Sequence, residues 1–123
     1  AFVYRLGPTG WALEQKLTPT FNGYFARFGN SLSLAGDDLF VGAPTDGNPI
    51  LSSGYVHRYL RHQGQWQEIA KFEGSYPFQS RAFGFRMVRQ GQELVICSPA
   101  QSSPAPGKVH LFALNPSTHL EAS

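Results

Sequence analysis

The sequence predicts an all-β fold built from repeated antiparallel units of four strands, and three observations lead to this prediction. The 123 residues include 10 Phe, 5 Tyr and 2 Trp, which are types that favour half-buried strands. Thirteen Gly and nine Pro indicate many turns. Landmark residues recur at a fixed spacing of 55 positions, whereas no segment shows a sustained helical period.

Four landmarks recur 55 residues apart along the chain. They are Phe28-Gly29 with Phe83-Gly84, Ala43-Pro44 with Ser98-Pro99, Trp11 with Trp66, and Leu17 with Phe72. A further set recurs at 53 residues and comprises Phe2-Val3-Tyr4, Tyr55-Val56-His57 and Lys108-Val109-His110. Because loops tolerate changes of length, we expect the difference between the two spacings to lie in the loops.

The first two strands are predicted at residues 2–6 and 11–17, where they form part of a unit. A whole unit follows at 28–72, with strands at 31–34, 39–41, 55–60 and 66–72. Gly36-Asp37-Asp38 is expected to form a tight turn, because Gly adopts positive φ and Asp bonds its own backbone. On the fourth strand, alternation predicts one face that carries Trp66, Glu68, Ala70 and Phe72.

Residues 83–114 supply three strands of another unit, which brings the expected total to nine. The tail, residues 115–123, has no apolar pattern and is expected to leave the fold. Antiparallel four-stranded units of this length are typical of β-propeller blades, and this chain holds about two of them. The alternative is a β-sandwich, although a sandwich requires no strict internal repeat.

Two blades and a fraction cannot close a ring, so three arrangements remain open. The chain is an excerpt of a longer propeller, or it assembles with copies of itself, or it completes a propeller in a partner chain. In the second arrangement the first strands of one copy would complete the last blade of the next. The absence of an initial Met favours the first arrangement.

The whole unit resembles an FG-GAP repeat, the blade of integrin α-subunit propellers. Phe28-Gly29, the Gly36-Asp37 turn and Gly42-Ala43-Pro44 match the family pattern, and Gly54-Tyr55-Val56 begins its third strand. The next unit departs from this pattern at Gly91-Gln92-Glu93 and at Ile96-Cys97-Ser98-Pro99. The residues that carry the structural motif are Phe28, Gly29, Gly36, Asp37, Gly42, Ala43, Pro44, Trp66, Phe83, Gly84 and Pro99.

The resemblance implies a non-catalytic propeller segment over residues 1–114 that acts as a protein-binding or structural scaffold. It also implies an extracellular or cell-surface setting with a role in adhesion or recognition. The expected partners are proteins or further blades, in the same chain or in other copies. The alternatives are an accessory propeller of a secreted hydrolase, similar in layout to the phospholipase D type with catalysis elsewhere, and a self-assembling lectin-like ring.

The composition of the chain excludes further classes of protein. The formal net charge of +2 provides no basic field for nucleic acid, and no apolar run approaches the length of a membrane span. The single cysteine, Cys97, excludes an internal disulfide framework. It stands where the first whole unit has Gly42, and there it is expected to act as a small apolar residue.

No cofactor and no catalytic residue are expected. Calcium needs about six or more oxygen ligands, and the loop after Pro44 offers one carboxylate, Asp46, as its only candidate. His57 and His110 hold equivalent positions, and Tyr4 is assigned the same place, so packing is the expected role. No serine lies in a nucleophile elbow, and the adjacent Asp37 and Asp38 do not suit glycosidase geometry.

The candidate binding residues lie on loops and on one strand. They are Asp46, Asn48, Tyr76, Phe78, Arg86 and Arg89, and the loops expected to carry contacts are 45–53, 76–80 and 100–106. Arg86 and Arg89 replace Ser31 and Leu34 on the first strand of the second unit. They are expected either to form a salt bridge, with Glu93 as the candidate partner, or to meet an anionic ligand or a partner loop.

Overall fold

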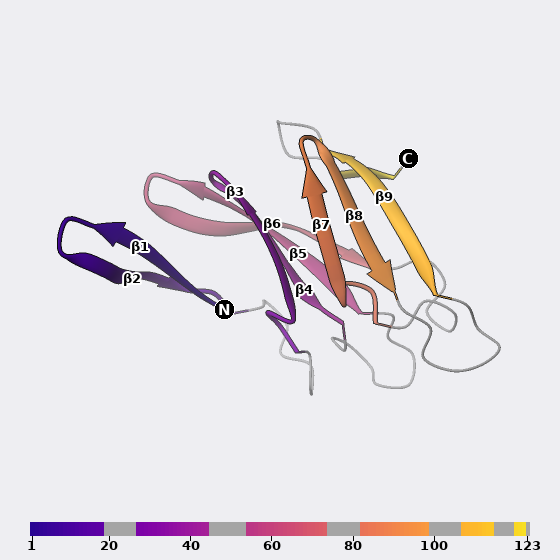
Figure 1. The fold of residues 1–123 in the computed structure, drawn as a ribbon, viewed down its shortest axis with the longest axis horizontal. Coiled ribbons are helices and arrows are strands. Elements are labelled where there is room, and N and C mark those ends of the chain that lie inside the picture. Colours follow the sequence, from indigo (N-terminus) through magenta and orange to yellow (C-terminus); the bar gives the residue numbers. More distant parts are fainter. Residues whose placement is uncertain (19–26, 45–53, 74–81, 99–106, 115–119, 123) are drawn as a thin grey trace.

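The computed structural model describes residues 1–18, 27–44, 54–73, 82–98, 107–114 and 120–122. In these ranges the chain forms ten strands, no helix, and three antiparallel sheets that follow one another along the molecule (Figure 1). The predicted all-β class is therefore confirmed. No helix in the described part of the chain is long and apolar enough to span a membrane.

The first sheet has two strands, and each of the others has four strands in sequential order. The first pairs β1 (Phe2–Gly7) with β2 (Gly10–Lys16). The second contains β3 (Ser31–Ala35), β4 (Asp38–Ala43), β5 (Tyr55–His62) and β6 (Gln65–Glu73). The third contains β7 (Arg86–Gln90), β8 (Glu93–Ser98), β9 (Lys108–Leu114) and β10 (Leu120–Ala122). Both four-stranded sheets have the meander order of a propeller blade.

The strand β10 corrects the expectation that residues 115–123 leave the fold. It pairs with β9, and Leu120 lies opposite Leu114. The described part therefore has ten strands rather than nine, and the third sheet has its fourth strand from this chain. Three residues are too short for an alternating pattern, so backbone pairing with β9 decides the position of this strand. Residues 115–119 and 123 lie outside the described residues.

The register of the strands shows which positions of the repeated units are equivalent. The β1–β2 and β5–β6 hairpins match throughout at a spacing of 55, because Gly7 pairs with Gly10 as His62 pairs with Gln65. Tyr4 therefore corresponds to Tyr59, and its predicted equivalence with His57 is wrong. The spacing of 53 applies between β5 and β9, where His57 faces Val41 as His110 faces Ile96.

A β-bulge corrects the predicted faces of β6. Arg58 pairs with Ala70 while Tyr59 pairs with Glu68, so Ile69 is an extra residue. Such a bulge breaks the alternation of side chains along a strand. Trp66 consequently packs on one side of the second sheet and Phe72 on the other, rather than both on one face.

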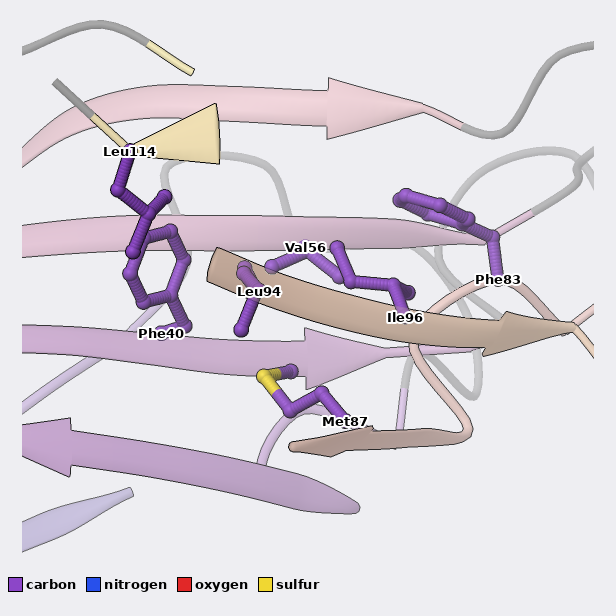
Figure 2. Packing of buried hydrophobic residues seen from close by; sticks show 7 residues of the cluster. All are labelled: Phe40, Val56, Phe83, Met87, Leu94, Ile96 and Leu114. Atoms are coloured by element: carbon purple, nitrogen blue, oxygen red, sulfur yellow. The ribbon is translucent and has the colours of Figure 1, made fainter. Parts of the chain in front are cut away.

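The core consists of two layers, one on each face of the second sheet. The layer toward the first sheet contains Leu17, Leu39, Val41, Tyr59 and Trp66, with Phe28 at its margin. The layer toward the third sheet contains Phe40, Val56, Phe83, Met87, Leu94, Ile96 and Leu114 (Figure 2). Alternate residues of β4 enter opposite layers, which explains why Leu39, Phe40 and Val41 are all buried.

Candidate functional site

An aromatic pair occurs twice at the contacts between successive sheets. Phe83 is fully buried and meets the edge of His110, with ring centroids 4.9 Å apart and planes at 88°. Phe28 meets His57 in the same way, at 5.3 Å and 75°. Each phenylalanine thus packs against the third strand of its own sheet while it fills the space toward the preceding sheet.

Three glycines allow the second and third sheets to approach at the backbone. At one of them, Gly54 with φ +87°, a Cβ would lie 2.5 Å from the carbonyl oxygen of Phe83. Gly84 has φ +90°, and a Cβ there would lie 2.9 Å from the carbonyl oxygen of Tyr55. A Cβ on Gly42 would collide with the Gly84 carbonyl oxygen and with Ser31 Oγ. Gly29 also has positive φ, at 98°, but its surroundings leave space for a side chain. Gly42, Gly54 and Gly84 are therefore required by the packing of one sheet on the next.

Polar bonds fix the register of the same contact. Ser31 Oγ donates to the Gly84 carbonyl at 2.6 Å, and Asn30 Nδ2 donates to the Phe85 carbonyl at 3.0 Å. Within the second sheet, the Gly29 amide donates to the Gly42 carbonyl at 3.0 Å, which closes the turn before β3. Ala43 and Pro44 are buried at the end of β4.

A shared carboxylate also links the two sheets. Arg58, on β5, donates from Nε and Nη2 to the two oxygens of Asp38, each at 2.9 Å. Arg89, on β7, donates from Nη1 to Asp38 Oδ2 at 2.9 Å and from Nε to the Gly91 carbonyl. The expected ion pair of Arg89 thus exists, but with Asp38 rather than Glu93, because β7 faces the second sheet at this position.

Part of this contact lies in a span of the chain that matches a known family. The sequence model of the FG-GAP repeat matches residues 11–59, from β2 to β5. This span matches an FG-GAP repeat. The matched span includes Phe28-Gly29, Gly36-Asp37 and Gly42-Ala43-Pro44, so the resemblance drawn from these motifs is confirmed. A comparison with curated proteins found no match.

The second sheet is joined to the first sheet by a second polar network. Glu14 Oε1 accepts bonds from Nε and Nη2 of Arg61 at 3.1 and 2.9 Å, and Glu14 Oε2 accepts the Trp66 indole N–H at 2.9 Å. Gln15 bonds both the amide and the carbonyl of Trp66, each at 2.9 Å. The bonds from Arg61 and then from Trp66 hold the pKa of Glu14 below its usual value.

A buried histidine lies at the centre of the same layer. His57 Nδ1 contacts Glu68 Oε1, and the imidazole has no exposed surface. Burial, followed by the charge of Glu68, raises the pKa of neighbouring Tyr59 above its usual range. The described residues contain no group of three or more metal-ligating side chains. His57 thus packs between Glu68, which its Nδ1 contacts, and the ring of Phe28.

Four of the six predicted binding residues lie outside the described residues. They are Asp46, Asn48, Tyr76 and Phe78, and Pro99 of the motif and the three candidate loops lie there too. A calcium site at Asp46 accordingly stays a prediction. Arg86 is exposed, with its guanidinium 5.8 Å from the Phe85 ring centroid, and Arg89 lies in the contact between sheets.

Sequence reasoning missed Arg58 and Glu14 as partners across sheets. A signal for Arg58 was available, since this charged residue alternates with the apolar Val56 and Leu60 on one face of its strand. A charge at such a position indicates a buried partner. Nothing in the local pattern pointed to Glu14, because its partners come from a hairpin about fifty residues later.

Proposed function

We propose that this chain is a segment of a β-propeller that acts as a protein-binding or structural scaffold without catalytic activity of its own. FG-GAP repeats are generally non-catalytic scaffold domains, which supports this function. The geometry adds a second argument, since each face of the second sheet packs against a neighbouring sheet through a layer of apolar side chains. The function therefore lies in stacking and in the surfaces that the stack presents.

The observation that carries the proposal is that two positions are buried in the second sheet, whereas their equivalents in the first sheet are exposed. Tyr59 and Trp66 are 4% and 6% exposed, because the first sheet covers them. Tyr4 and Trp11 hold the same places in the first sheet but are 55% and 70% exposed. The residue types that pack against a neighbouring sheet in the second sheet are thus exposed to solvent in the first sheet.

The third sheet has a second exposed apolar surface at the opposite end of the stack of sheets. Val88, Val109 and Leu111 are exposed on the side away from the second sheet. Register places Val109 and Leu111 where the second sheet has Val56 and Arg58, which face the third sheet. Large solvent-exposed apolar patches on a protein generally mark contact surfaces. We infer that both end faces contact further blades, in the same protein or in other copies.

Solution mass tests the stacking function. We expect the 123-residue chain to associate, as measured by light scattering after size exclusion, with far-UV dichroism on the same peak. The double variant Trp11→Lys with Val109→Lys places a charge on each end face and should remain monomeric. Gln63→Lys with Gln65→Lys adds the same charge at exposed hairpin positions and should associate like the parent. A folded monomeric parent would contradict the proposal.

The proposed setting is extracellular or at the cell surface, with a role in adhesion or recognition through the loops between strands. This part of the proposal rests on the resemblance of the repeat to the blades of integrin α-subunits. It is tested by protease digestion of intact cells that express the protein. Cleavage without permeabilisation is expected, and complete protection until the cells are opened would refute a surface location.

A further inference from the structure

A cavity of about 470 Å³ lies between the second and third sheets, at the end where the hairpins turn. The β3–β4 turn, the β5–β6 hairpin and the β7–β8 turn all contribute to it. Its walls include three arginines, Arg58, Arg61 and Arg89, together with the apolar side chains of Leu60 and Ile69. The volume falls in the range of small-ligand sites, about 300–1,000 Å³.

The inner wall carries one positive charge in excess. Arg58 and Arg89 both bond the single carboxylate of Asp38, so two guanidinium groups share one negative charge. On the outer wall, Arg61 is already paired with Glu14 and lies 3.6 Å from Asp37, which is 65% exposed. The unbalanced charge is therefore at Arg58 and Arg89.

Arg58 also has unused hydrogen-bonding capacity. Its side chain is 2% exposed, and its Nη1 is buried without a hydrogen-bond partner among the described residues. Asp38 occupies the side of the guanidinium formed by Nε and Nη2, which leaves the end formed by Nη1 and the second Nη2 hydrogen. Because that end has almost no accessible surface, Arg58 acts on the cavity through its positive charge rather than through a direct hydrogen bond.

We propose that this cavity binds a carboxylate group, held by the partly exposed guanidinium of Arg89, with the buried positive charge of Arg58 behind it. The ligand is a small organic acid with an apolar stem, because Leu60 and Ile69 flank the cationic wall. The site goes beyond the scaffold function, since it lies inside the stack and does not depend on the end faces. It also gives a role to Arg89 other than pairing.

The test is a titration of the full chain with sodium acetate at constant ionic strength, followed by the NMR signals of the arginine Nε–H groups. We expect saturable shifts at Arg58 and Arg89 and none at Arg86, which lies on the same strand as Arg89 but does not line the cavity. A parallel titration with sodium phosphate separates a carboxylate site from a general anion site. Saturation by phosphate but not by acetate would overturn the assignment.

Two matched pairs of variants locate the site. Arg89→Gln should weaken acetate binding at least about tenfold, as expected for the loss of a charged hydrogen-bonding partner, whereas Arg86→Gln should leave it unchanged. Gln92 lies on the exposed rim of the cavity, so Gln92→Lys should strengthen binding and Gln92→Glu should weaken it, without disturbing the core. Equal affinity in all four variants, or no saturable shift in the parent chain, would refute the proposal.

Discussion

Gly42 is the residue at which the contact between the second and third sheets has the least tolerance. A Cβ there meets the Gly84 backbone, which belongs to the neighbouring sheet and cannot rotate away. We expect Gly42→Ala to lower the free energy of unfolding by about 1–3 kcal/mol, as overpacking does elsewhere. Urea denaturation measures the change. The control is Gly7→Ala, whose Cβ would lie 3.8 Å from the nearest atom and should have little effect.

The contribution of Glu14 to the stability of the fold depends on pH in a predictable way. Because its folded-state pKa lies below its ordinary value of 4.5, its stabilising contribution is complete above pH 4.5 and is lost as the pH falls through the folded-state pKa. We expect urea unfolding at stepwise pH to show a decline in that window that Glu14→Gln reduces. Trp66→Phe removes one donor and should move the decline toward pH 4.5. An identical pH profile for Glu14→Gln and the parent would contradict this account.

The β5–β6 hairpin shows how an element depends on two turn residues. Gln63 and Gly64 both have positive φ, 51° and 77°, which is the pattern of the tight turn that suits strand twist. Asn adopts this conformation more readily than Gln, so Gln63→Asn should stabilise the chain by a few tenths of a kcal/mol or more. Gly64→Ala should destabilise it by about 1–2 kcal/mol. Thermal unfolding would show the two shifts, and shifts of the same sign would contradict the assigned turn.

At the scale of the whole molecule, Asp38 joins two sheets through buried charge. Asp38→Asn keeps the shape but leaves Arg58 buried without its counter-charge, a change that typically costs about 3–5 kcal/mol. We expect a large loss of stability in urea denaturation. The adjacent Asp37→Asn is the matched control, since this exposed side chain should contribute within about 1 kcal/mol. Similar losses in both variants would mean that Asp38 does not join the sheets.

Hairpins were the most predictable part of the fold. Strands at 2–6, 31–34 and 55–60 were expected within a few residues of where they lie, because alternation and Gly-rich turns are local signals. The bulge at Ile69 was not predictable, since it arises from pairing with β5 rather than from the sequence of β6. The same holds for β10, which only the edge of β9 identifies.

The sequence by itself determined the class of fold, the repeat and the FG-GAP motif, because these depend on spacing and on residues with special backbone requirements. Only the tertiary structure decided which charges meet. Asp38, Arg58 and Arg89 come from three strands on two sheets, and Glu14 reaches a hairpin about fifty residues later. Such pairs depend on how sheets stack, and the physical reason is that a buried charge selects its partner in space rather than along the chain.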